Sequence, residues 1–344
     1  MLEQKRKYVE LILGIGVTIF CLWLAVPGSD LTSKWEGLKA TATALESAEY
    51  EWLFPLMALL TLFYVTKAYR WATLLHPIHN FRTNQVIPAT MIGFMGNNIL
   101  PAHLGELLRM YVLSRTHMLS KTSVLASIIL ERVLDAIAIT ILFTITSLTL
   151  ELPKMYELGG LIGATGVVLT LVCLILYAYR TEMVLRFWDR RFRFLPEKFH
   201  HKVARMITAG SHGMDILRSP GRIVSTVLFS IFHWSLLAFY IYIVFWAFSI
   251  NLPFSGALLV LCGTMVAVMI PSAPGFWGVV QAVFTVALTP LGVPQELALA
   301  ASVYYLASQY VPTTVTGLIF LGFTGFRLGE LKSHAEAATF HADV

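Results

Sequence analysis

The sequence has 344 residues, of which 57% are hydrophobic and 13% are charged. Soluble domains carry about twice that charged share. Apolar stretches of about 20 residues, the length that crosses a bilayer core, recur along the chain. The composition excludes a water-soluble globule and predicts an all-α polytopic membrane protein, with about six full spans and two broken, re-entrant helical hairpins.

The charge balance is mildly basic, at +5 from 25 basic and 20 acidic side chains. In membrane proteins Lys and Arg gather in cytoplasmic loops, so this excess reflects orientation and gives no reason to expect a nucleic-acid partner. Cys21, Cys173 and Cys262 each lie in an apolar run without metal-ligand spacing. We therefore expect neither a disulfide framework, a metal site nor a cofactor.

The first predicted element is an uncleaved span over Val9–Val26, after a basic N-terminus. Asp30–Trp52 is richer in acids than in lysines and predicts an amphipathic helix on the extracytoplasmic surface. Leu53–Tyr69 then predicts a span that returns inward. Four basic residues are interpreted as its cytoplasmic end: Lys67, Arg70, His76 and Arg82.

The next segment, Asn84–Leu113, is apolar but interrupted by glycines, asparagines and Pro101. Backbone amides freed by Pro and Gly cannot face lipid, so such a break lies inside protein or lines a wet cavity. We interpret this segment as a re-entrant hairpin. Thr122–Leu150 follows as a long outward span.

The second half of the chain repeats this order. The predicted elements are an inward span over Leu158–Tyr179, a basic cytoplasmic segment over 180–222, an outward span over Ile223–Ile250, a second broken hairpin over Ser255–Leu288 and a last span over Leu297–Phe323. This order places both termini in the cytoplasm. The halves, 1–150 and 158–326, read as inverted repeats with equivalent breaks at Pro101-x-x-x-Gly105 and Pro274-x-x-x-Gly278, although two independent breaks explain the pattern equally well.

Five charged residues fall within apolar surroundings: Glu106, Arg109, Glu131, Arg132 and Asp135. Counting about 1.5 Å per residue from Lys121 puts Glu131 roughly 15 Å into the membrane. Glu131 and Asp135 are four residues apart and share a helix face, and Arg132 is the expected partner of both acids. Intramembrane charges are costly unless paired or hydrated, so the cluster is a candidate functional site.

The competing interpretation is a structural ion network that pins the hairpin to the long span. Asn97 and Asn98 also have two possible roles: an asparagine beside a helix break either binds a lipid head group or caps the helix. His233 is expected to form an interhelical hydrogen bond.

The run Gly96-Asn-Asn-Ile-Leu-Pro-Ala-His-Leu-Gly-Glu-Leu-Leu-Arg109, the run Glu131-Arg-Val-Leu-Asp135 and the later Pro274-Gly-Phe-Trp-Gly278 resemble the lysylphosphatidylglycerol synthase transmembrane, or flippase-like, family. That family is the membrane module of bifunctional proteins that aminoacylate and translocate phosphatidylglycerol, and it also occurs alone. The chain stops at Val344, about where the soluble synthase domain would begin. The resemblance therefore implies a stand-alone form that makes no aminoacylated lipid itself.

Two positions depart from the family pattern. His103 stands where the family usually has Arg, and Gln281 where it usually has Glu. With His103 neutral, the cluster counts two arginines against three acids, so its neutrality would depend on protonation or on a bound cation. This difference bears on which lipid the chain would handle.

The expected function is binding or translocation of a lipid with an anionic head group, either a phospholipid or a polyprenyl-phosphate-linked glycan. Arg109 and Arg132 would meet the phosphate, and the three acids would orient them or meet a cationic moiety of the lipid. Further residues would line the path: Asn97, Asn98, His103 and Gln281. One alternative is an accessory subunit that presents lipid to a separate synthase or glycosyltransferase. Another is a membrane transferase that uses Glu106 or Asp135 as a base. Common enzyme motifs are missing, so we expect no enzyme, and the expected location is the cell membrane.

Overall fold

The computed structural model describes residues 2–100, 104–150, 154–192, 197–213, 220–270, 272–326 and 329. Within these ranges all the regular secondary structure is helical, and no strand is present. This confirms the predicted all-α class. The predictions that depend on Pro101 or His103 lie outside the described residues.

The helices of the first half are α1 (Leu2–Ala25), α2 (Leu31–Glu46), the 3-10 turn η1 (Tyr50–Trp52), α3 (Leu53–Leu75), α4 (Thr83–Ile99), α5 (Gly105–His117) and α6 (Lys121–Thr149). Polar caps fix some of their starts. The Asp30 side chain accepts a hydrogen bond from the Ser33 backbone N–H at 2.7 Å, which begins α2 and lowers the pKa of that carboxyl. The Ser120 hydroxyl accepts from the Ser123 backbone N–H in the same way and begins α6.

The helices of the second half are α7 (Lys154–Tyr179), α8 (Thr181–Arg191), α9 (Glu197–Gly213), α10 (Pro220–Ala247), α11 (Phe254–Ala267), η3 (Pro274–Phe276), α12 (Val279–Leu288), η4 (Thr289–Leu291) and α13 (Gln295–Thr324). Each predicted span corresponds to a helix, and most helix ends lie within four residues of the expected ones; α1 begins seven residues earlier than predicted and α3 finishes six residues later.

Five segments of the described chain are long and apolar enough to cross a membrane: Tyr50–Leu75, Gly160–Tyr177, Gly221–Ala247, Pro274–Leu291 and Gln295–Thr324. Helix α6 has 29 residues and is also long enough, but it carries several charges in its first half. The Pro274–Leu291 segment consists of η3, α12 and η4 and is not one continuous helix.

Helices α4 and α5 pack against each other as the predicted hairpin, and α4 also packs along α13. With 17 and 13 residues they are about 25 and 20 Å long, shorter than the hydrocarbon core of about 30 Å. Glycines make the close approach possible. A Cβ on Gly105 would meet the Asn97 side-chain oxygen at 2.5 Å, and one on Gly96 would meet the Cα of Gly105 at 2.9 Å. Re-entrance into the membrane remains a prediction.

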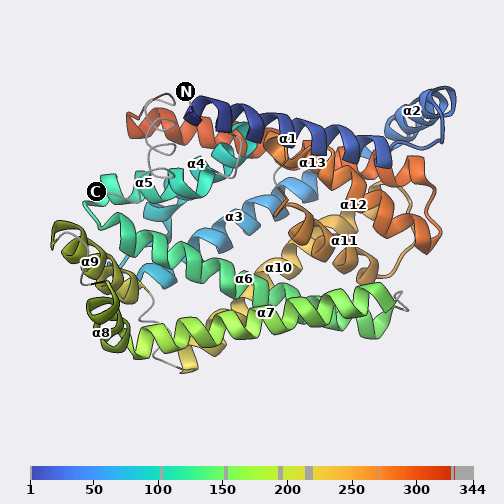
Figure 1. Ribbon diagram of the computed structural model, residues 1–344. Coiled ribbons are helices and arrows are strands. Elements are labelled where there is room, and N and C mark those ends of the chain that lie inside the picture. Colours follow the sequence, from blue (N-terminus) through green and yellow to red (C-terminus); the bar gives the residue numbers. More distant parts are fainter. Residues whose placement is uncertain are drawn as a thin grey trace.

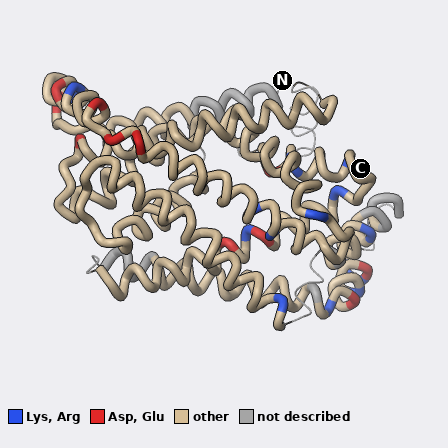
Figure 2. Tube along the Cα trace, turned by 180° about the vertical axis from the view of Figure 1, so that it is seen from behind, with Lys and Arg blue, Asp and Glu red and all other residues tan. Residues whose placement is uncertain are grey.

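The long helices run side by side, with α8 and α9 at one end and α2 at the other (Figure 1). Helix α1 begins and α13 finishes at the end that carries α8 and α9. Most Lys and Arg residues gather at this same end, and acidic residues prevail around α2 (Figure 2). The basic and acidic segments that the sequence distinguishes therefore lie at opposite ends of the molecule.

Candidate functional site

The interior holds a network of seven charged side chains at the junction of α3, α5 and α6. Its members are Lys67, Arg70, Glu106, Arg109, Glu131, Arg132 and Asp135. Five of them are at most 8% exposed, and only Glu106 and Arg132 reach the surface. The five charged residues that the sequence singled out do come together.

Glu131 is the centre of the network and is fully buried. Its Oε1 lies 2.7 Å from the Lys67 ammonium and 3.1 Å from Nη2 of Arg70, and its Oε2 lies 2.7 Å from Nη2 of Arg109. One carboxylate thus joins three cations from two other helices. In a low-dielectric interior such contacts offset the large cost of removing the charges from water.

Asp135 lies one turn further along α6 and shares two of these cations. Its Oδ2 is 3.2 Å from Lys67, and its Oδ1 contacts Arg70 and accepts a hydrogen bond from the indole of Trp234 at 2.8 Å. Arg70 also donates to the Ser230 hydroxyl at 2.7 Å. Helix α10 therefore contributes hydrogen bonds to the network without adding a charge.

The exposed edge of the network is formed by Glu106 and Arg132, whose side chains are 21% and 46% exposed. Glu106 contacts Arg132 and also lies 2.6 Å from Nε of Arg109. Arg132 is 3.9 Å from Asp135. Arg109 is buried, with its guanidinium 4.6 Å from the centre of the Trp71 ring. Of the two predicted phosphate ligands, Arg132 is thus the one within reach of an incoming molecule.

Two sequence interpretations are wrong here. Lys67 and Arg70 do not mark the cytoplasmic surface, because both are buried, at 2% and 1% exposed, and both pair with Glu131 and Asp135. Arg132 is not the main partner of these acids, since it contacts Glu106 and only approaches Asp135. The charge count changes accordingly. In the part of the chain that the structure describes, four cations of the network face three acids, so its net charge is positive, whereas an acidic excess was expected.

A signal for the missed cations was present in the sequence. Helix α3 continues to Leu75, so Lys67 and Arg70 lie within it. They are three residues apart and share a face with Trp71 and Leu74, both fully buried. Had the predicted span been extended by one and a half turns, this face would have indicated buried cations in need of acidic partners.

Asn97 and Gln281 each close one of the two helix breaks. The side-chain oxygen of Asn97 accepts a hydrogen bond from the Gly105 backbone N–H at 3.0 Å, and that of Gln281 accepts from the Gly278 backbone N–H at 2.6 Å. Gly278 has a φ of 87°, a conformation that suits glycine. Gln281 is on α12, which packs against α1, α11 and α13. The structure therefore does not bring Gln281 into the network.

Other predicted residues have structural partners. The Asn98 amide donates to the Tyr310 carbonyl and the Thr314 hydroxyl, at 3.3 and 3.0 Å, and so ties α4 to α13. His233 is hydrogen-bonded through Nδ1 to the Thr66 hydroxyl at 2.9 Å, which confirms the predicted interhelical bond. His103 lies outside the described residues. No group of three or more metal-ligating side chains is found in the part of the chain that the structure describes.

The fold and the site define a polytopic helical membrane protein with a buried ion network beside a glycine-packed helix pair. Comparison with known sequences gives the family. The family described as "Lysylphosphatidylglycerol synthase TM region" matches residues 11–317, and the chain belongs to it. A similar protein is UPF0104 membrane protein PH1989 of Pyrococcus horikoshii, 22% identical over 335 residues that cover 92% of this chain and 97% of the relative.

Proposed function

We propose that the protein binds a lipid with an anionic head group, a phospholipid or a polyprenyl-phosphate-linked glycan, and carries that head group across the bilayer past the ion network. The observation that carries the proposal is the charge of the network. Among the described residues, Lys67, Arg70, Arg109 and Arg132 face only Glu106, Glu131 and Asp135, which leaves one positive charge in excess.

An uncompensated charge within a membrane is costly, so a bound anion at the network would be favoured. The excess is accessible at one place, because Arg132 is 46% exposed while the other three cations are buried. A guanidinium binds phosphate through two parallel hydrogen bonds. Arg132 is therefore the proposed phosphate ligand, and the buried charges hold the helices that present it.

The decisive variant is Arg132→Gln, which removes the excess charge without leaving an acid unpaired. Glu106 keeps Arg109 at 2.6 Å, and Asp135 keeps Lys67 at 3.2 Å. We expect affinity for anionic lipid to fall roughly ten- to a hundred-fold. The melting temperature should change little, because exposed ion pairs contribute only about 0–1 kcal/mol. Lipid binding in nanodiscs and movement of labelled lipid in proteoliposomes are the measurements.

Arg205→Gln is the matched control, since Arg205 is an exposed arginine on α9, away from the network. Its lipid binding should equal that of the unmodified protein. Equal losses in both variants would mean that binding reflects general surface charge, and the proposal would fail. Binding that depends on Arg132 without lipid movement would instead favour an accessory protein that presents lipid to a separate synthase or glycosyltransferase.

A further inference from the structure

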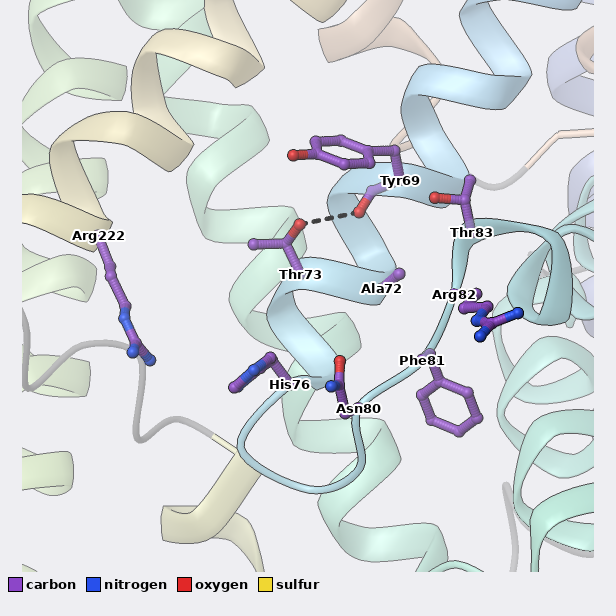
Figure 3. A pocket seen from close by; sticks show the side chains of 9 residues that line it. All are labelled: Tyr69, Ala72, Thr73, His76, Asn80, Phe81, Arg82, Thr83 and Arg222. Carbon is purple, nitrogen blue, oxygen red and sulfur yellow. Dashed lines mark hydrogen bonds between the residues drawn. The ribbon is translucent and has the colours of Figure 1, made fainter.

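A second polar site lies apart from the ion network, where α3 finishes and α4 and α10 begin (Figure 3). It is a surface pocket of about 590 Å³. The pocket is lined by Tyr69, Ala72, Thr73, His76, Asn80, Phe81, Arg82, Thr83 and Arg222.

The lining is suited to an anion. It includes two guanidinium groups, an imidazole, an amide and three hydroxyl groups, and none of the nine residues is acidic. The sequence that supplies eight of the nine has no Asp or Glu anywhere between Glu51 and Glu106. Helices α4 and α10 both begin at the pocket, so the positive ends of two helix dipoles add to its charge.

The polar lining comes from more than one element, since Arg222 belongs to α10 and the other residues lie on α3, just after it or at the start of α4. In Figure 3, Arg222 extends from the start of α10 on one side of His76 and Asn80, and Arg82 lies on the opposite side with its guanidinium directed away from them. The Thr73 hydroxyl donates to the Tyr69 carbonyl at 3.0 Å. The charged and polar tips remain available to a ligand, because His76, Asn80, Arg82 and Arg222 are all exposed.

The pocket and the ion network use different faces of the same helix. Tyr69, Thr73 and His76 follow one face of α3, and the buried Lys67 and Arg70 follow another. Both sites also involve α10, through Arg222 at its start and Ser230, which accepts from Arg70. A ligand that contacts both Arg82 and Arg222 would therefore connect the end of α3 with the start of α10, two helices that also contribute to the ion network.

We infer that this pocket binds a phosphate group, and that the phosphate of an anionic lipid in the adjacent leaflet is its occupant. The pocket lies at the end of the candidate span Tyr50–Leu75, where head groups would be found. The lining Tyr69 is 52% exposed and offers an aromatic ring at that level. Free phosphate has the same chemistry and is the alternative source. The inference does not depend on lipid transport.

The test replaces Tyr69 with a photo-crosslinking amino acid in the full chain, reconstituted in phosphatidylcholine nanodiscs that contain some phosphatidylglycerol. We expect crosslinking to phosphatidylglycerol, reduced at least about ten-fold by Arg82→Gln combined with Arg222→Gln. The control is Arg190→Gln combined with Arg191→Gln, two exposed arginines in the last turn of α8, which removes the same charge. The control should retain crosslinking.

Titration calorimetry with inorganic phosphate identifies the source. Arginine-dependent lipid crosslinking supports the lipid. Arginine-dependent phosphate binding without crosslinked lipid supports a phosphate site with a soluble occupant and rejects the lipid. Crosslinking that falls equally in both double variants, or the absence of both signals, overturns the inference. Crosslinking measures only whether lipid occupies the pocket. Its outcome is therefore independent of whether Arg132→Gln affects lipid binding or transport at the ion network.

Discussion

At the scale of single residues, Glu131 is the fully buried acid of the network and joins cations of both α3 and α5. Glu131→Gln keeps the shape but removes the charge, leaving Lys67, Arg70 and Arg109 buried with too few acids. Breaking a buried ionic group in this way costs about 3–5 kcal/mol. We expect a loss of that size in the free energy of unfolding, measured by denaturant titration in micelles.

The matched substitution is Glu36→Gln, which makes the same chemical change in an exposed pair. Glu36 lies 2.9 Å from Lys39, and both side chains are more than half exposed. Its loss should change the unfolding free energy by no more than about 1 kcal/mol. Similar effects for the two variants would show that the interior charges are well hydrated and do not depend on one another.

At the scale of elements, the contact between α4 and α5 depends on glycine. Gly105→Ala places a methyl group against the Gly93 carbonyl and the Asn97 side chain. Backbone cannot move aside as a flexible side chain can, so we expect destabilisation of about 1–3 kcal/mol or more and separation of the helices. Because α5 carries Glu106 and Arg109, lipid binding should weaken as well. Thermal unfolding and lipid binding measure the two effects.

Gly163→Ala on α7 is the control, because nothing lies within 4 Å of a Cβ added there. It should leave stability unchanged or raise it slightly, since alanine is the better helix former. If both variants melt at the same temperature, the close approach of α4 and α5 does not limit stability.

The sequence predicted the helices well because the membrane imposes a length on apolar runs that can be read directly. Partners across helices were harder to predict. The acids and arginines of α5 and α6 stood out within apolar runs, whereas Lys67 and Arg70 fell where a span was expected to finish. The rule that basic residues mark cytoplasmic ends uses only the position of a residue along the chain. Whether a cation near a helix end faces water or an acid depends on which other helices pack beside it, and this is known only from the structure.

At the scale of the whole molecule, we propose that the end carrying α8 and α9 is cytoplasmic and the end carrying α2 is extracytoplasmic. In a chain without its native cysteines, Arg205→Cys on α9 should be labelled by an impermeant reagent only after the membrane is opened. Leu31→Cys, at a position 77% exposed on α2, should be labelled in intact cells. The reverse pattern would contradict the proposed orientation.

The positions of the network residues along the chain determine the order in which their charges appear during synthesis. Helix α3 emerges with Lys67 and Arg70 but with no acid, and Glu131 follows Arg70 by 61 residues. Until α6 is made, these cations have to stay near the interface at the end of their span, where long basic side chains reach water. Once α6 is inserted, all seven charges are present. Helix α10 adds Ser230 and Trp234 only afterwards, so the ionic core can assemble during translation, before the second half of the protein exists.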